Sequence, residues 1–366
     1  MLRMIPETGE GQMLIRGKPF RGKELEDLKG FLADADLQYE EGIEYSVCLT
    51  EKDGRIMGCG CVEENVIKCV AVDKRYQGQG LLTMIMSELM QYLYEKGRTH
   101  IFIYTKPKNL DIFADLGYYK VYRTNEILLL ENREKGFASY LKKLRDETPK
   151  EALPQRGVPE TSENGDGTGR YPEIGAVVAN CNPFTLGHRY LLEEALKQCD
   201  HLHLFVLSDN RGAFSAQERY EMVKRGIEGL EKVILHETSG YMISAATFPT
   251  YFFKDRTQGE LANCRLDLEL FGACIAPWLQ ITSRFVGTEP CCRITRAYNE
   301  EMKRILPGYG ISVTEMERKT KGGMPISASE VRRSIVKGEF GRVKEAVPEK
   351  VYRYLMENTG DKYAKD

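Results

Sequence analysis

Short apolar runs separated by turns fill the first patterned region of this chain. They predict strands over 44–50, 55–62, 65–72 and 101–104, with two more between 118 and 130. Leucine and isoleucine repeat at helical spacing over 79–96, where Gly97 is expected to end a helix. A shorter helix is expected over 109–116. This order predicts a domain that combines a sheet with few helices.

Strand and helix patterns alternate regularly in the second patterned region. The predicted elements are 174–180, 188–198, 202–208, 215–228 and 232–235, in turn strand, helix, strand, helix and strand. Such alternation favours right-handed βαβ units around a parallel sheet. We therefore expect a two-domain α/β chain whose second half is a Rossmann-like parallel α/β fold.

A stretch with almost no apolar periodicity separates the two regions. It runs from 149 to 172 and contains Pro154, Pro159 and the run Asn-Gly-Asp-Gly-Thr-Gly at 164–169. This composition is typical of a solvated linker. The chain's 366 residues also exceed one ordinary core. The expected domains are 1–148 and 173–366.

Composition narrows the classes of partner. The net charge is −2 and no long Lys/Arg block occurs, so no nucleic-acid partner is expected. No stretch approaches the roughly 18 consecutive apolar residues of a membrane span, and the first 20 residues lack a signal-peptide pattern. The ten cysteines form no C-x-x-C pair, and no metal site is predicted from them. A cytoplasmic protein without a membrane partner is the expectation.

A glycine-rich turn joins the predicted strand 65–72 to the following helix. Its glycines allow successive backbone N–H groups to face a pyrophosphate at a helix N-terminus. The hexapeptide resembles R-x-x-G-x-G of the GNAT acetyltransferase family, and the resemblance covers roughly residues 20–130. It implies an acetyltransferase-like mixed sheet and a site for a CoA-like arm. The residues assigned to that arm are Arg75, Gln77, Gly78, Gln79 and Gly80.

One position departs from this family. The family often carries a tyrosine in the short helix, as an acid for the leaving thiolate, and Phe113 stands there in this chain. Phenylalanine cannot donate a proton. Tyr118, Tyr119 and Tyr122 are nearby alternatives that strand packing would explain equally well.

The second region begins with a strand, a tight turn and a helix over 174–198. The turn and helix start read Asn-Cys-Asn-Pro-Phe-Thr-Leu-Gly-His-Arg at 180–189. Unpaired N–H groups at a helix N-terminus attract phosphate, and the imidazole of His188 can donate to phosphate oxygens there. Further along, Ser329 and Arg332 fall on one helix face and can reach one triphosphate. The alternative is that Ser329 caps a helix over 330–336 and Ser327 is a turn residue.

These two segments, about 140 residues apart, resemble the H-x-G-H and I-S-x-S-x-x-R motifs of the nucleotidyltransferase superfamily. Thr185 replaces the first histidine, and its hydroxyl carries no charge. The stretch 285–290 looks like the strand end that reads adenosine in that superfamily, and Phe184 suits a core position equally well. The implied catalytic residues are His188, Thr185, Arg332 and Ser329. The implied nucleotide-binding residues are Asn182, Phe184, Gly187, Gly287, Glu289, Ser327 and Arg219, the last beside a capping box at 215–218.

The histidines outside these motifs carry little signal. His201 and His203 alternate with apolar residues along a predicted strand, which favours a role as sheet residues. His100 and His236 fall at strand edges, and no function is predicted for them.

Nearly the whole chain resembles the citrate lyase ligase family. The resemblance rests on the order of the two modules and on residues 182–191, 244–252, 285–290 and 325–329. It implies that acetate and ATP, with Mg²⁺, give acetyl-adenylate and pyrophosphate. The thiol of a CoA-like group on the acyl carrier subunit of citrate lyase then takes the acetyl group and AMP leaves. Here the thiol is the nucleophile, so no acid is needed where Phe113 stands.

Two other functions remain open at this point. One is an adenylyltransferase for pantetheine phosphate or a mononucleotide, fused to an acetyltransferase. The other is a catalytically dead protein that senses adenine nucleotide or acyl-CoA, suggested by Thr185 and Phe113. Pyrophosphate release with acetate, and none with phosphopantetheine, distinguishes the ligase from the first. Absence of any ATP–pyrophosphate exchange favours the second.

Overall fold

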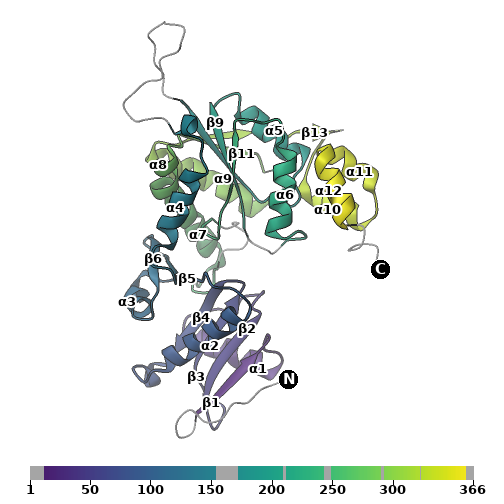
Figure 1. The fold of residues 1–366 in the computed structure, drawn as a ribbon. Coiled ribbons are helices and arrows are strands. Elements are labelled where there is room, and N and C mark those ends of the chain that lie inside the picture. The colour runs from purple at the N-terminus through teal and green to yellow at the C-terminus, as the bar shows by residue number, and fades with distance from the viewer. Residues whose placement is uncertain are drawn as a thin grey trace. The chain divides into compact units, whose positions relative to one another are not determined.

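The computed structural model describes residues 12–153, 172–208, 212–242, 249–289, 292–321 and 323–359 (Figure 1). Two compact units result: Met1–Phe137 with Phe248–Leu266, and Ala138–Thr247 with Asp267–Asp366. Each unit is therefore made of two separate segments of the chain, and the units depart from the expected domains at two places. Most of helix α4 Gly136–Asp146 folds with the second unit, whereas the segment 249–266 folds with the first. The expected linker 149–172 lies mostly outside the described residues.

The first unit is built on a mixed sheet. In its described residues seven strands lie in the order β1-β2-β3-β4-β5-β7-β6. The strands are β1 Gln12–Gly17, β2 Tyr45–Glu51, β3 Ile56–Glu63, β4 Val66–Val72, β5 Phe102–Thr105, β6 Tyr119–Arg123 and β7 Leu128–Glu131, and the helices are α1 Lys23–Asp34, α2 Leu81–Glu95 and α3 Leu110–Ala114. The predicted strands and both predicted helices are confirmed. The apolar face of α2 packs on β2, β3 and β4 and forms this unit's core.

Strands β4 and β5 separate soon after they start to pair. They are parallel neighbours joined only at Val66 with Phe102 and Ile67 with Ile103. Just beyond, Cys69 has a positive φ of 53° and the register with β3 shifts. Such a bulge bends a strand away from its neighbour. The carboxyl half of β4 is therefore left open on the β5 side.

The second unit is built on a parallel sheet, as predicted. Five strands of its described part lie in the order β10-β9-β8-β11-β12. They are β8 Ile174–Ala179, β9 His201–Val206, β10 Val233–Glu237, β11 Ser283–Gly287 and β12 Ser312–Met316. The chain winds outward from β8 to β10 and then restarts at β11 on the other side of β8. Loops that leave β8 and β11 thus diverge at their carboxyl ends, which is where open α/β sheets bind ligands.

Helices cover this parallel sheet. They are α5 Leu186–Ala195, α6 Ala216–Gly226, α8 Ala276–Leu279, α9 Arg293–Ile305, α10 Ala328–Val336, α11 Phe340–Ala346 and α12 Glu349–Thr359, and a short hairpin of β13 Thr320–Lys321 and β14 Met324–Pro325 precedes α10. Helix α7 Arg256–Leu270 folds with the first unit as far as Leu266. Residues of α5, α6, α10, α11 and α12 share one apolar cluster with β8, β9 and β11. In Figure 1 the last three helices form the yellow group near the C-terminus. No helix within the described ranges is both long and apolar enough to cross a membrane.

A chain of three polar side chains, two of them buried histidines, ties the turn after α4 to two strands of the parallel sheet. The Nδ1 atom of His203 lies 2.9 Å from Nε2 of His236, and Nδ1 of His236 lies 3.0 Å from Oε2 of Glu147. Both imidazoles are fully buried. Burial and the neighbouring His236 lower the pKa of His203 to about 3. The sequence had predicted sheet residues here and had given His236 no role.

We expect this chain of side chains to make stability sensitive to acid. In the unfolded protein His203 takes up a proton near the ordinary histidine pKa of 6.5, but in the folded protein only near 3. Between these values the unfolded state binds more protons, so the free energy of unfolding falls as the pH falls. One such histidine contributes a slope of about 1.4 kcal/mol per pH unit. Urea unfolding of the wild type and of His203→Gln from pH 7 to pH 4.5 measures the difference in slope.

The matched control is His201→Gln, because His201 lies on the same strand but is partly exposed. It should keep most of the wild-type pH slope, because burial and His236 are the larger causes of the low pKa of His203. Equal slopes for the wild type and His203→Gln would contradict the assignment.

Candidate functional site

The two nucleotide-type motifs meet at the carboxyl edge of the parallel sheet. Gly187 lies in the first turn of α5, and the Ile326 carbonyl packs directly against its α-carbon. A methyl group placed on Gly187 would lie 2.9 Å from that backbone oxygen. This separation is shorter than real contacts allow, so only glycine fits. Gly187, an expected nucleotide-binding residue, thus admits the backbone of the second motif.

Thr185 begins helix α5 and fixes the position of His188. The Thr185 hydroxyl accepts from the backbone N–H of His188 at 3.3 Å, which makes it the N-cap of the helix. In return, the backbone N–H of Thr185 donates to Nδ1 of His188 at 3.0 Å. Thr185 is buried, with 1% of its surface exposed. The hydroxyl that replaces the first motif histidine therefore caps the helix and orients the second one.

The same bonds decide which nitrogen of His188 carries a proton. Because Nδ1 accepts an N–H, the neutral ring carries its hydrogen at Nε2, on the side away from Thr185. Burial, with the positive charge of nearby Arg318, lowers the pKa of His188 to about 4. At neutral pH the residue is thus an uncharged donor through Nε2–H. A donor of this kind suits a phosphate oxygen that gains charge during reaction.

Arg332 joins the second motif to the first. Its guanidinium donates to the backbone carbonyl of Asn182 and, at 3.0 Å, to the hydroxyl of Ser329. Ser327, not Ser329, caps α10, because its hydroxyl accepts from the N–H of Glu330 at 3.1 Å and the helix begins at Ala328. The alternative that Ser329 caps a helix starting at 330 is therefore wrong. Ser329 is exposed on the same helix face as Arg332.

Asn182 and Phe184 lie in the loop after β8 but differ in surroundings. Phe184 is fully buried in the core and its ring stacks on His188, with centroids 5.6 Å apart. Asn182 is 9% exposed, and its Oδ1 finds no partner among the described residues. A buried amide oxygen without a partner is costly, so a ligand that donates to it would be favoured. Of these two, Asn182 is the better placed to contact a nucleotide.

Arg219 supports this loop from within the core. It is fully buried, and its guanidinium donates to the carbonyl of Asn180 at 2.9 Å and to Oδ1 of Asn180 at 2.5 Å. The predicted capping box that precedes it is present, formed by Ser215 and Glu218. Arg219 thus holds the end of β8 rather than offering its charge at the surface.

The loop after β11 contributes an ion pair to the same edge. Glu289 pairs with Arg318, whose Nε also donates to the carbonyl of Thr288 at 2.5 Å. The side chain of Arg318 passes the α-carbon of Gly287, where a methyl group would lie 3.9 Å from Cγ. Pro290 lies outside the described residues. Arg318 was missed in the sequence because it stands in the polar run Glu-Arg-Lys-Thr-Lys at 317–321, which matches no motif.

The first unit holds a separate cavity beside the glycine-rich turn. Its volume is about 430 Å³. The lining comes from the end of β4, the glycine-rich turn, the start of α2 and the start of α3, namely Val70 to Val72, Tyr76, Gln77, Gly78, Gly80 to Thr83, Asn109, Ile112 and Phe113. Gly78 and Gly80 both have φ of 78°, and Gly80 precedes α2. Only glycine adopts this conformation readily, so these two positions define the turn.

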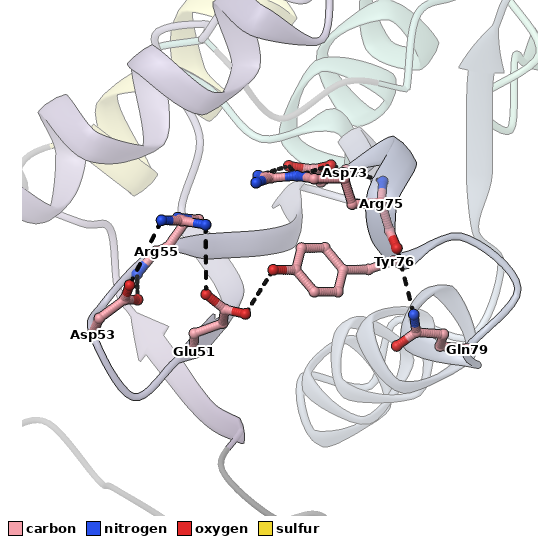
Figure 2. A network of polar contacts seen from close by, with 7 residues as sticks. All are labelled: Glu51, Asp53, Arg55, Asp73, Arg75, Tyr76 and Gln79. Carbon is pink, nitrogen blue, oxygen red and sulfur yellow. Dashed lines mark hydrogen bonds and ion pairs between the residues drawn. The ribbon is translucent and has the colours of Figure 1, made fainter.

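A polar network holds the turn from outside (Figure 2). Asp73 caps the 3₁₀ turn Lys74–Tyr76 by accepting from the N–H of Arg75 at 2.9 Å, and it pairs with the Arg75 guanidinium at 2.6 Å. Tyr76 donates its hydroxyl to Glu51 at 2.6 Å, and Gln79 reaches the Arg75 carbonyl at 3.5 Å. The Arg75 side chain is 58% exposed, so it can leave Asp73 for a phosphate.

Packing explains the aromatic residues near α3. Phe113 borders the cavity and is otherwise buried against the ring of Tyr118. Tyr118 donates its hydroxyl to the sulfur of Met90 at 2.9 Å, and burial raises its pKa above the usual value. Tyr118 is therefore committed to the core and is a poor acid.

Both halves of the chain match known protein families. The citrate lyase ligase C-terminal domain family matches residues 174–355, and the acetyltransferase (GNAT) family matches residues 17–118. The citrate (pro-3S)-lyase ligase of Klebsiella pneumoniae is 39% identical over 94% of this chain and 95% of its own length. That of Haemophilus influenzae is 39% identical over 91% and 96%. An acyl-CoA N-acyltransferase structure from Pseudomonas aeruginosa covers 33% of this chain and 98% of its own, with 14% identity and a TM-score of 0.29.

The contact between the motifs can be tested at Gly187. Gly187→Ala should force the Ile326 backbone away and lower the free energy of unfolding by about 1–3 kcal/mol. Urea unfolding measures the effect. Gly308→Ala is the control, because a methyl group there meets nothing within 4 Å and its φ is not positive. A Gly187→Ala variant as stable as the control would contradict the proposed close packing.

Proposed function

The chain belongs to the citrate lyase ligase family, and from that membership we propose that it activates citrate lyase by acetylating the thiol of a CoA-like group on the acyl carrier subunit. In the first step an acetate oxygen attacks the α-phosphorus of ATP. The bond from that phosphorus to the bridging oxygen breaks and pyrophosphate leaves. In the second step the thiol gives up its proton and attacks the acetyl carbonyl of the mixed anhydride, and AMP leaves.

The meeting of the two motifs at the carboxyl edge of the second unit is the observation that carries the adenylation step. It gathers the Nε2–H of His188, the guanidinium of Arg332 and the guanidinium of Arg318 around one edge of the sheet. A fixed donor and two positive charges suit a triphosphate. In this proposal His188 donates to the α-phosphate as its negative charge grows, and Arg332 with Ser329 holds the phosphates.

In this proposal the remaining residues of that edge bind the nucleotide or hold neighbouring residues in position. The buried, unpartnered Oδ1 of Asn182 accepts from the nucleoside. Thr185 and Arg219 act indirectly, by orienting His188 and by holding Asn180. Glu289 is already paired with Arg318, so we assign Mg²⁺ to the phosphate oxygens of ATP, where it offsets their charge.

We assign the CoA-like arm to the cavity of the first unit. Its pyrophosphate would lie at the N-terminus of α2, against the N–H groups of the turn that holds Gly78 and Gly80. Arg75 would exchange Asp73 for phosphate. Because the thiol attacks and does not leave, the reaction needs no acid at Phe113, which agrees with an apolar residue at that position.

Replacing His188 tests the adenylation step. His188→Ala should lower the rate of acetate-dependent ATP–pyrophosphate exchange by about 10²–10³-fold, because one donor to the transition state is lost. His201→Ala is the control, a partly exposed histidine outside the site. Near wild-type exchange in His188→Ala would refute the assigned role. Exchange that requires phosphopantetheine instead of acetate would show that the chain is an adenylyltransferase.

Replacing the glycines of the turn tests the division of labour. Gly78→Ala and Gly80→Ala should reduce acetyl transfer to the carrier, because each adds strain of about 1–2 kcal/mol in the left-handed conformation. ATP–pyrophosphate exchange should stay near the wild-type rate. The control is Gly30→Ala, where a methyl group meets nothing within 4 Å and φ is not positive. Equal loss of exchange and of carrier acetylation would contradict separate sites.

A further inference from the structure

A lysine without an acidic partner lies beside the meeting point of the two motifs. Lys319 follows Arg318 in the segment between β12 and α10, and it is exposed. Its ammonium nitrogen lies 5.6 Å from the centre of the Tyr190 ring on α5. Among the described residues no carboxylate pairs with Lys319, so its charge faces the ring. The segment therefore brings a further positive charge to the edge that already holds Arg318.

The backbone of Lys319 is fixed against the start of α5. The N–H of Ile326 donates to the Lys319 carbonyl at 3.0 Å, and the Ile326 carbonyl packs against Gly187. The hairpin of β13 and β14 closes the loop between Lys319 and Ile326. Tyr190 comes three residues after Gly187, so both lie on the same face of the helix. Lys319 consequently stands over the face of α5 that the second motif contacts.

The other two cations of this edge already have partners. Arg318 lies close enough to His188 for its positive charge, after burial, to lower the pKa of that histidine to about 4. The guanidinium of Arg318 is paired with Glu289. That of Arg332 donates to a backbone carbonyl and to a hydroxyl. Lys319 is thus the cation that a ligand recruits without breaking an ion pair between described residues.

The chemistry of the side chain suits a ligand that moves during the reaction. An exposed cation–π contact is weak, and a charged phosphate oxygen is a stronger partner for an ammonium group. The ammonium is a compact charge on a flexible stem with three N–H donors, whereas a guanidinium is planar and binds in one fixed geometry. Lys319 can therefore follow a phosphate group that departs, while Arg332 stays with the motif.

We propose that Lys319 leaves the Tyr190 ring to bind the β- and γ-phosphates of ATP and the pyrophosphate formed from them. The inference rests on the proposed adenylation site of the second unit. When the bond from the α-phosphorus to the bridging oxygen breaks, its electron pair stays on that oxygen and the pyrophosphate gains negative charge. Lys319 keeps its proton and offsets this charge, while His188 donates to the α-phosphate. The ring keeps the ammonium beside the edge until the phosphates bind.

Binding of nucleotides that differ in their phosphates tests this inference. In titration calorimetry of the full chain with Mg²⁺ and ATP, Lys319→Ala should bind ATP roughly tenfold or more weakly than the wild type, because a charged donor is lost. AMP lacks the β- and γ-phosphates, so both proteins should bind it equally. The KM for pyrophosphate in the exchange assay should rise together with the dissociation constant of ATP. Lys319→Arg keeps the charge and should retain most of the affinity for ATP.

Matched variants keep the result interpretable. Lys197→Ala removes a lysine that is 67% exposed just beyond the other end of α5, and it should bind ATP like the wild type. Tyr190→Leu removes the ring and should bind pyrophosphate roughly two- to fivefold more tightly, because no ring contact competes for the ammonium. Thermal unfolding confirms that each variant is folded. If Lys319→Ala does not fold, Lys319→Gln removes the charge but keeps an apolar stem over the ring.

Several results overturn the inference, and they are distinguishable. If a folded variant without the charge of Lys319 keeps the wild-type affinity for ATP, the lysine does not bind the phosphates, while the adenylation site stands. If ATP and AMP lose affinity equally, Lys319 supports the structure of the edge instead. Binding of pyrophosphate to Tyr190→Leu that is no tighter than in the wild type would refute release from the ring. If the wild type shows neither ATP binding nor acetate-dependent exchange, the proposed adenylation site itself fails.

Discussion

The candidate adenylation site depends on one close backbone contact, that of the Ile326 carbonyl with Gly187. Any side chain at 187 would meet this oxygen at 2.9 Å, so the helix that follows β8 and the segment that precedes α10 can approach only because the residue is glycine. Arg332 then reaches the Asn182 carbonyl and closes the same junction with a charged hydrogen bond. Two segments far apart in sequence thereby form one rigid edge, which is what a triphosphate needs.

Helix capping and candidate chemistry use the same atoms at this edge. Thr185 caps α5 with its hydroxyl and orients His188 with its backbone N–H. The lost motif histidine is thus replaced by a residue that stabilises the helix and fixes the imidazole tautomer. Positive charge near His188 comes instead from Arg318, which belongs to the chain beyond β12 and is itself held by Glu289. A neutral donor beside a fixed cation avoids burying a protonated histidine.

Each compact unit contains segments from both sides of the expected linker, and this affects how the protein can be divided. A fragment that began at the expected linker would contain Thr250 and Tyr251 without Glu40 and Tyr104, the residues that bind them. It would therefore expose buried polar and aromatic groups. Likewise, Glu147 and most of α4 support the parallel sheet although they precede the linker. The units are consequently not separable at residues 149–172 without loss of internal contacts.

The sequence by itself determined the strands and helices of 44–130 and 174–235, the parallel second sheet and both motif segments, because hydrophobic period, glycine turns and helix starts are local properties. It also predicted the turn at Gly78 and Gly80 and proposed roles for His188 and Arg332. Only the tertiary structure decided that Phe184 and Arg219 are buried, that Ser327 caps α10, and that Gly187 faces a carbonyl. Arg318, His236 and Tyr251 were beyond prediction for the same reason. Their surroundings are made by strand order and long-range packing, which bring together residues that carry no shared pattern along the chain.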